Sequence, residues 1–136
     1  MDARERFASG RVARLATVGD DGAPHVVVVT FALDGDVIYT AVDSKPKRTQ
    51  KLKRLANIRH EPRVALLVDH YDDSDWSLLW WARADGRGRV MEPGQELYDW
   101  AVELLARRYE QYRAEPPSGP AIAVAVERWS SWTASS

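Results

Sequence analysis

The residue types best suited to chemistry gather in one strongly basic segment, Lys45–Arg63. Eight of its nineteen residues are lysine or arginine, and only Glu61 is acidic. The segment lacks the alternation typical of a strand, and Pro46 suits the first turn of a helix. The sequence therefore predicts a basic helix from about Pro46 to Ala56, followed by a connector over 58–62.

One face of this predicted helix is cationic. At about 100° per residue, Lys47, Lys51 and Arg54 point in nearly the same direction, and Arg48 lies close to them. An anion at the helix start would meet free backbone amides, the positive end of the helix dipole and these cations together. The pattern indicates a phosphate or carboxylate site. The alternative interpretation, a solvated basic surface helix, stays open.

Other kinds of site are disfavoured. Outside the basic segment acidic residues outnumber basic ones, so most of the surface would repel nucleic acid. No two of His25, His60 and His70 share a predicted element at the spacing of metal ligands, and no metal site is expected. The sequence contains no Gly-x-Ser-x-Gly nucleophile elbow, and it identifies no catalytic residue.

Three of the six tryptophans, Trp76, Trp80 and Trp81, lie close together in the sequence. Neighbours on a strand face opposite ways, so one of Trp80 and Trp81 is expected in the core. The other then needs cover, which a subunit interface or the flat ring of a coenzyme would supply.

The elements that must position these residues are short strands with tight turns. Asp21-Gly22 and Asp34-Gly35 separate apolar runs, which is a strong hairpin signal. The β-branched run 25–33 is nearly uninterrupted and predicts a strand covered on both faces. Gly86 and Gly88 predict a bulge or a close backbone approach. Strands are predicted over 12–18, 25–33, 36–42, 63–69, 76–91 (one bent strand or two) and 121–126. Helices are predicted over 2–9, 46–56 and 96–109, the last covering the barrel.

Length and composition predict one domain over residues 1–136. A chain of 136 residues with 45% hydrophobic residues can bury a single core. It has no cysteine, and its first residues lack the apolar run of a signal peptide, so a cytoplasmic protein is expected. No stretch is apolar enough to span a membrane. Helices that fall between groups of strands favour an α+β barrel, whereas the glycine fingerprint of a Rossmann fold is missing.

Five segments in order resemble the pyridoxamine 5'-phosphate oxidase-like split β-barrel family. They are 11–25, Val37–Thr40, Ser44–Arg48, Asn57–Asp69 and Ala84–Val90. The chain looks closest to the branch that uses the deazaflavin coenzyme F-420. The resemblance implies a Greek-key split barrel of about six or seven strands with peripheral helices. It also implies a homodimer that holds the coenzyme in a groove at the subunit interface.

The resemblance also implies a set of coenzyme-binding residues. His25 and Thr30 occupy positions where flavin-binding oxidases tend to have arginine and lysine, a difference that favours a coenzyme with a long acidic tail over FMN. Ser44, Lys45, Lys47 and Arg48 would approach the phosphate, with Lys51 supporting them. The remaining candidates are Tyr39 and Thr40 on the third predicted strand, and Trp81.

The function implied is an oxidoreductase that transfers hydride from reduced F-420 to a small unsaturated organic acceptor. The protein would supply position and exclusion of water. Two alternatives stay open: an FMN-dependent oxidoreductase of the same type, and a non-catalytic flavin- or haem-binding protein. No histidine follows His70, so oxidation of vitamin B6 is not expected.

Overall fold

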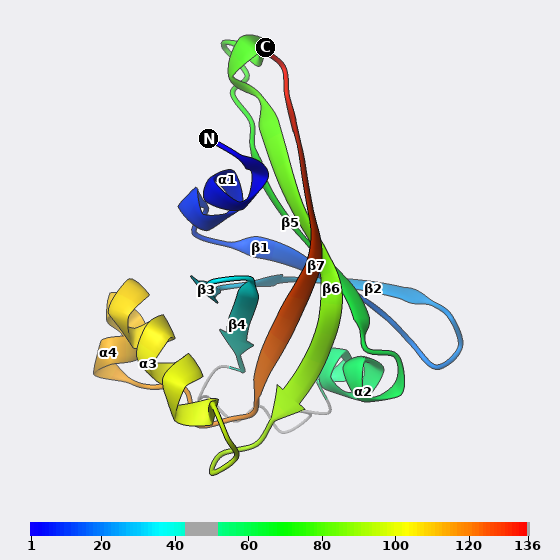
Figure 1. Cartoon of the computed structure of the whole chain (residues 1–136), viewed down its shortest axis with the longest axis vertical. Helices are drawn as coiled ribbons and strands as arrows, with labels where there is room; N and C mark the ends of the chain where they lie inside the picture. The colour runs from blue at the N-terminus through cyan, green and yellow to red at the C-terminus, as the bar shows by residue number, and fades with distance from the viewer. Residues whose placement is uncertain (43–51, 136) are drawn as a thin grey trace.

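The computed structural model describes residues 1–42 and 52–135, and its strands form one antiparallel sheet (Figure 1). The seven strands lie in the order β2-β1-β5-β6-β7-β4-β3. Their bounds are β1 (Ala13–Val18), β2 (Pro24–Val29), β3 (Ala32–Asp34), β4 (Val37–Ala41), β5 (Arg63–His70), β6 (Trp80–Met91) and β7 (Ala121–Thr133). The helices are α1 (Ala3–Ser9), α2 (Lys53–His60), the short 3₁₀ helix η1 (Trp76–Leu78), α3 (Tyr98–Arg108) and α4 (Glu110–Ala114). This architecture confirms the predicted α+β split barrel.

Local sequence explains several element boundaries. Asp2 caps α1, because its side chain accepts the Glu5 N–H at 2.8 Å. Gly22 and Gly35 turn the chain after β1 and β3 with φ of 81° and 59°, a region that favours glycine. These are the two turns that the Asp-Gly pairs predict.

β6 and β7 are the longest strands of the sheet, and they pair along their whole length. The register shifts between Asp85 and Gly86, which confirms the predicted bulge. A Cβ at Gly86 would overlap the carbonyl oxygen of Ala125, so the close approach of the two strands requires glycine there. Together with β5, these strands extend past the rest of the molecule as an arm that carries η1 at its tip (Figure 1).

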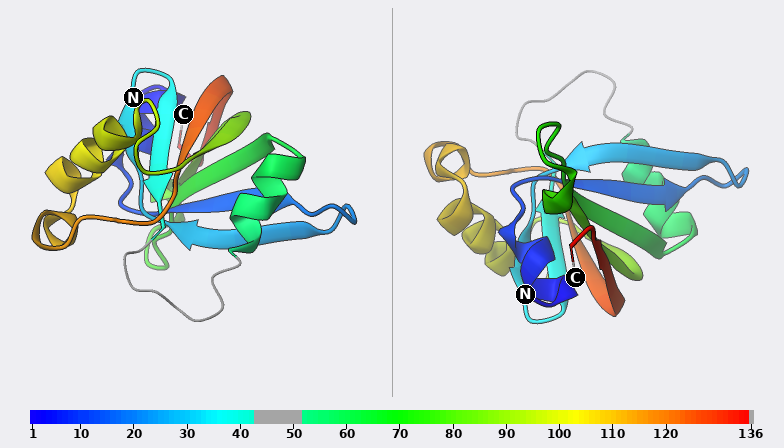
Figure 2. Two further views of the ribbon diagram at one scale, coloured as in Figure 1. Left: turned by 90° about the horizontal axis from the view of Figure 1, so that it is seen from below. Right: turned by 90° about the horizontal axis from the view of Figure 1, so that it is seen from above.

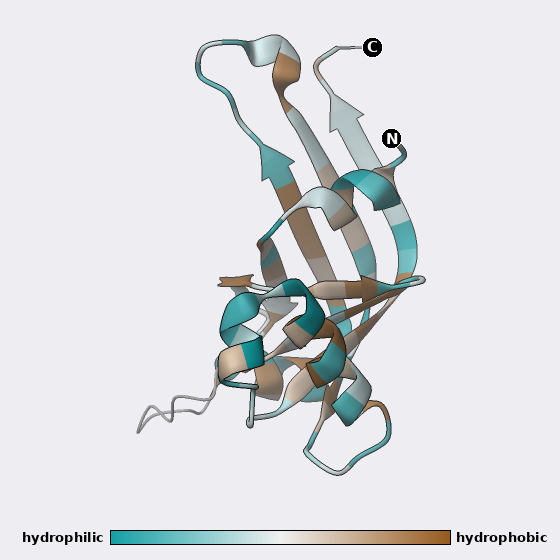
Figure 3. Cartoon of the chain, turned by 90° about the vertical axis from the view of Figure 1, so that its left-hand side faces the viewer, coloured by the Kyte–Doolittle hydropathy of each residue, from teal (hydrophilic) through white to brown (hydrophobic). Residues whose placement is uncertain are grey.

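Helices cover the sheet from different sides, as the end views in Figure 2 show. α1 inserts Phe7, which is fully buried with its ring 4.9 Å from Phe31 and 5.3 Å from Trp129. α3 packs on β3, β4 and β7 through Ala101 and Leu105, as its periodicity predicts. α2 packs against β1 and β6. In Figure 3 the covering helices carry both hydrophilic and hydrophobic residues, as amphipathic helices do.

The predicted strand 25–33 is wrong in both extent and burial. The run divides at Thr30-Phe31 into β2 and β3, which lie at opposite ends of the strand order. β2 is the first strand, and its outer face is open, with Val26 61% and Val28 63% exposed. A β-branched run indicates strand propensity, but it does not indicate whether a second layer of structure covers the strand.

Other boundaries also differ from the predictions. α2 continues to His60, where a connector was expected, and the start of the predicted helix lies outside the described residues. Trp76–Leu78 is a 3₁₀ turn rather than a strand, because Asp75 accepts the Ser77 N–H and Ser77 hydroxyl and caps it. α4 was not predicted. β7 runs to Thr133 rather than ending at 126, since pairing with β6 stabilises a segment whose own pattern is mixed.

Candidate functional site

The predicted site residues divide into those that the structure describes and those that it does not. Five of the candidates lie outside the described residues: Ser44, Lys45, Lys47, Arg48 and Lys51. Their assignment to the phosphate stays a prediction. The described chain resumes at Leu52, which immediately precedes α2. The described part of the basic segment therefore begins at the start of α2.

Among the described residues, no side chain caps the amino end of α2. Its N-cap is Leu52, which makes no side-chain capping bond, and its first turn contains no acidic residue. The first amide groups of a helix need such acceptors, and the helix dipole makes this end attractive to anions. The predicted anion site stays a prediction, and α2 starts at Lys53, later than the predicted helix.

Arg54 in the first turn of α2 strengthens this positive end. Its side chain is half-buried, and burial lowers the pKa of the guanidinium, while the nearby Tyr112 hydroxyl raises it by less. Among the described residues, no carboxylate forms an ion pair with it. The adjacent Lys53 is exposed, so the two neighbouring cations differ in environment.

Thr30 lies at the break between β2 and β3, where it contacts α4. Its hydroxyl is 2.8 Å from the Tyr112 hydroxyl, and either oxygen can donate. The next residue, Phe31, is held by Tyr109: the Tyr109 hydroxyl accepts the Phe31 N–H at 3.1 Å and lies 2.9 Å from the Phe31 carbonyl oxygen. The end of β2 is thus fixed by two tyrosines far away in sequence.

His25 lies at the other end of β2, on the face covered by α2. It pairs with Thr17 in the β1–β2 ladder, and the Thr17 hydroxyl accepts a hydrogen bond from Asn57 of α2 at 3.0 Å. The Nδ1 atom of His25 is buried and has no hydrogen-bond partner in the described part of the chain. A buried imidazole nitrogen of this kind is suited to a ligand group.

Tyr39 and Thr40 lie side by side on β4, and both are buried, with exposures of 3% and 1%. Tyr39 faces the cluster under α3, and burial raises the pKa of its hydroxyl, with Asp34 adding to the rise and Arg89 opposing it. Neither side chain lies on an open surface of the described chain. Their part in ligand binding stays a prediction.

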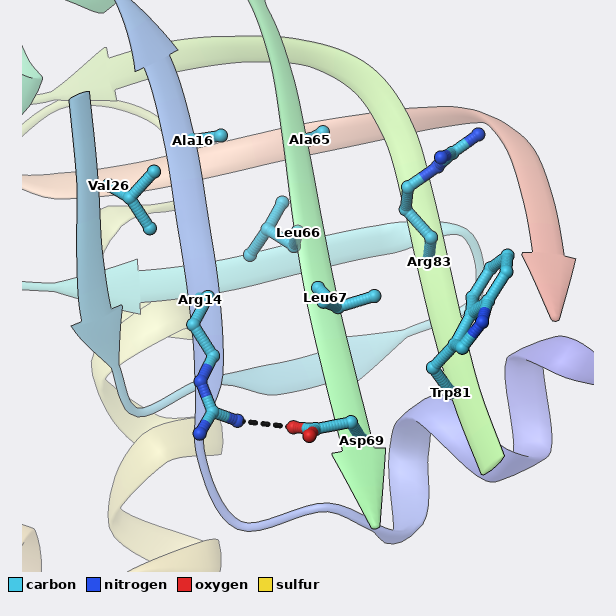
Figure 4. A pocket seen from close by; sticks show the side chains of 9 residues that line it. All are labelled: Arg14, Ala16, Val26, Ala65, Leu66, Leu67, Asp69, Trp81 and Arg83. Atoms are coloured by element: carbon cyan, nitrogen blue, oxygen red, sulfur yellow. Dashed lines mark hydrogen bonds and ion pairs between the residues drawn. The ribbon is translucent and has the colours of Figure 1, made fainter. Parts of the chain in front are cut away.

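Trp81 lines a hollow of about 460 Å³ on the outer face of the sheet (Figure 4). Its floor is apolar and includes Ala16, Val26, Ala65 and Leu67. Trp80, by contrast, packs against the main core cluster, as strand alternation predicts. A hollow of this volume is within the range of small-molecule sites.

Two ion pairs lie at the edge of the hollow. Arg14 pairs with Asp69 at 2.5 Å, and Arg83 pairs with Asp85 at 3.0 Å, while the guanidinium of Arg83 also lies 5.8 Å from the Trp81 ring centre. The hollow therefore combines an apolar floor with polar edges, the usual composition of an interface or a ligand site.

Sequence reasoning did not identify the two tyrosines that contact the chain at the end of β2. Tyr109 is the last residue of the predicted third helix and Tyr112 lies just beyond it. No local signal marks either, since Tyr109 contacts Phe31, 78 positions away, and Tyr112 contacts Thr30, 82 positions away. Arg54 was placed on the cationic face, but its partial burial depends on packing that the pattern does not contain.

Within residues 1–42 and 52–135, no group of three His, Cys, Asp or Glu side chains has the arrangement of a metal site. No helix of the same residues combines the length and apolar character of a membrane span.

Comparison with solved structures gives the same fold at low sequence identity. A conserved hypothetical protein of Mycobacterium tuberculosis is 21% identical, with a TM-score of 0.74 over 98% of this chain and 86% of that one. A FAD-binding protein of Mesorhizobium loti is 24% identical, with a TM-score of 0.67 over 95% and 90% of the two chains. The haem storage protein HutZ of Vibrio cholerae is 14% identical, with a TM-score of 0.72 over 96% and 90%.

Sequence comparison is more specific. No curated protein matches the chain significantly. The family model described as pyridoxamine 5'-phosphate oxidase, however, matches residues 2–133, nearly the whole chain. The sheet order, the covering helices and this match together show that the chain belongs to the pyridoxamine 5'-phosphate oxidase family of split β-barrels.

Proposed function

We propose that the protein is an oxidoreductase that binds the deazaflavin coenzyme F-420 and transfers hydride to a small unsaturated organic acceptor. The observation that carries the proposal is the amino end of α2, where no side chain of the described residues caps the helix and the first turn contains the half-buried Arg54. A phosphate-bearing coenzyme supplies the acceptor that both require.

The described residues fit such a coenzyme in two places. Arg54 would pair with the phosphate, and the buried Nδ1 of His25 would accept or donate one hydrogen bond to the coenzyme. Lys47, Arg48 and Lys51 would extend the positive surface toward the acidic tail of F-420. This distribution of charge favours F-420 over FMN, whose single phosphate needs fewer cations.

The protein would act by binding and positioning. Reduced F-420, when bound, supplies the hydride. The Arg54 guanidinium and α2 amides would fix the phosphate, and the fixed phosphate would orient the ring relative to the acceptor.

We also propose a homodimer formed through the outer face of the sheet. Val28 lies opposite Arg14 in the β1–β2 ladder, and Arg14 lies opposite Leu67, so the exposed valines of β2 adjoin the apolar hollow. A second copy on this face would cover Val26, Val28 and the hollow together. An apolar centre edged by charged pairs is the pattern of a subunit interface.

A binding screen tests the proposal. The purified protein is titrated with F-420, FMN, FAD and haem, and quenching of tryptophan fluorescence is followed. We expect F-420 to bind most tightly. Oxidation of reduced F-420 is then measured with a panel of enones and quinones against a control without acceptor.

Each result selects one function. Tighter binding of FMN or FAD would replace the proposal with a flavin-dependent oxidoreductase, a class that the FAD-binding relative makes reasonable. Tight haem binding without turnover would indicate a storage or sensing protein, in line with the haem storage relative. Binding of F-420 without turnover on any acceptor would remove the catalytic part of the proposal.

A further inference from the structure

A second cavity, of about 360 Å³, lies between α1 and the arm. Figure 1 shows α1 beside the arm, below the tip that carries η1, and α1 contacts β5, β6 and β7. One wall of the cavity is Arg6 of α1, and the other residues that line it belong to the arm or shortly follow β7. The volume is within the range of about 300–1,000 Å³ that small-molecule sites span.

This α1–arm cavity is on the opposite face of the sheet from the Trp81 hollow. Trp80 lies opposite His70 of β5 and Thr133 of β7 in the strand ladders, so these three side chains share one face. The adjacent Trp81 faces the other way. The cavity is therefore separate from the hollow that the proposed dimer covers.

An aromatic surface forms the centre of the cavity wall. The Arg6 guanidinium lies 5.6 Å from the centre of the Trp80 ring, and the His70 ring stacks on the same indole at 6.2 Å and 22°. Phe7, the next residue of α1, is fully buried in the core, which fixes the position of Arg6. Leu78 adds an exposed apolar side chain to the wall. An aromatic surface edged by N–H donors suits a flat ligand with a negative group.

The charge of Arg6 is not already paired within the protein. Among residues 1–42 and 52–135, no carboxylate forms an ion pair with Arg6. No aspartate or glutamate is among the described residues that line the cavity. A guanidinium matches a carboxylate through two parallel hydrogen bonds, so the Arg6 end of the cavity favours a carboxylate.

The hydroxyl groups that line the cavity favour the reverse polarity. Ser77 donates its hydroxyl proton to Asp75 at 2.6 Å. Thr133 donates its own to the Ser135 carbonyl oxygen at 2.9 Å. Each hydroxyl oxygen can then only accept a hydrogen bond from a ligand. The negative charge of Asp75 beside Ser77 also favours a ligand donor on that side.

We propose that the α1–arm cavity binds a small aromatic carboxylate that also carries a hydroxyl or amino group. The carboxylate pairs with Arg6, and the ring packs on Trp80. The hydroxyl or amino group donates to Ser77 or Thr133. The site does not involve α2, so it does not depend on the proposed function.

4-Hydroxybenzoate is the probe, and calorimetric titration measures its affinity for the purified protein. We expect one site per chain, with shifts of the Trp80 indole N–H and His70 ring signals in NMR spectra. Benzoate lacks the donor group and should bind about two- to tenfold more weakly, the effect of one neutral hydrogen bond. 4-Hydroxybenzyl alcohol lacks the carboxylate and should bind at least about tenfold more weakly.

Arg6→Gln should weaken 4-hydroxybenzoate at least about tenfold and change the affinity for 4-hydroxybenzyl alcohol little, because only the carboxylate needs the charge. Arg4→Gln is the matched control. Arg4 is on the same helix but does not line the cavity and donates to the Gly35 carbonyl oxygen, so its loss should leave both affinities unchanged. Urea unfolding of each ligand-free variant separates lost binding from lost stability.

The three probes keep the test decisive even if Arg6→Gln fails to fold, because they compare carboxylate and hydroxyl on the parent protein. A parent that does not bind 4-hydroxybenzoate would overturn the site, and so would NMR shifts at Trp81 in place of Trp80. Equal affinities for 4-hydroxybenzoate and 4-hydroxybenzyl alcohol, or for the parent and Arg6→Gln, would overturn the role of Arg6. Equal affinities for benzoate and 4-hydroxybenzoate would overturn the role of the hydroxyl acceptors. F-420 should bind Arg6→Gln as it binds the parent, so the failure of one proposal leaves the other standing.

Discussion

Replacing Arg54 with glutamine tests the anion site most directly. Glutamine keeps an amide donor and an extended side chain but removes the charge. Pairing a guanidinium with a phosphate contributes about 1.5–3 kcal/mol as charge-assisted hydrogen bonds. At about 1.4 kcal/mol per tenfold, Arg54→Gln should raise the Kd for F-420 by roughly 10- to 150-fold.

The same substitution should have an opposite effect on the ligand-free protein. Arg54 is partly desolvated, as the lowered pKa of its guanidinium indicates, and it lies in the first turn of α2, where the helix dipole disfavours a cation. Both effects oppose folding in the absence of an anion. The free energy of unfolding of ligand-free Arg54→Gln should therefore equal or exceed that of the parent.

Adding the coenzyme should reverse the order of stability. Ligand at 100 times the parent Kd stabilises the parent by about 2.7 kcal/mol, whereas a variant with about 100-fold weaker binding gains only about 0.4 kcal/mol. Urea unfolding with and without F-420, together with calorimetric titration, measures both quantities.

Lys53→Gln is the control for this experiment, because Lys53 is the adjacent cation on α2 but is exposed. It should lower the affinity little. Two results would refute the reasoning: a Kd of Arg54→Gln equal to that of the parent, or an equal loss in Lys53→Gln. A large loss of stability in ligand-free Arg54→Gln would show that Arg54 has a structural role instead.

Three further predictions concern assembly, packing and the arm. Val28→Asp should turn the dimer into a monomer near 15.4 kDa by light scattering without loss of folding, since Val28 is 63% exposed; a parent that is already monomeric would contradict the proposed interface. Gly86→Ala should lower the free energy of unfolding by at least about 1–3 kcal/mol in urea, because a Cβ overlaps the backbone of β7; unchanged stability would show that the bulge can relax. Hydrogen bonds from Ser77 hold the pKa of Asp75 below its ordinary value, so the η1 cap contributes stability above the ordinary carboxyl pKa and loses it as the pH falls through the lowered one. An NMR titration should show this lowered pKa, and Ser77→Ala should raise it; an unshifted Asp75 would exclude the cap.

Sequence reasoning could assemble a candidate site because several of its residues are close together in the chain. The basic segment places cations and a helix start within a few residues. The resemblance assigns His25 and Thr30 to ligand positions, and strand alternation leaves one of Trp80 and Trp81 in need of cover. The structure describes Trp81 beside an apolar hollow and His25 with a buried, unpartnered nitrogen. Which of these residues touch the coenzyme stays a prediction that the binding experiments test.

The order of elements and their turns were determined by the sequence itself. Asp-Gly pairs set the hairpin turns because a positive φ suits glycine, and helical periodicity defined α3 because side chains three and four residues apart share a face. Tertiary structure alone decided that β2 is an edge strand, that Arg54 is half-buried, and that Tyr112 meets Thr30. These features depend on contacts between segments far apart in the chain, and a local pattern carries no information about which distant segment covers it.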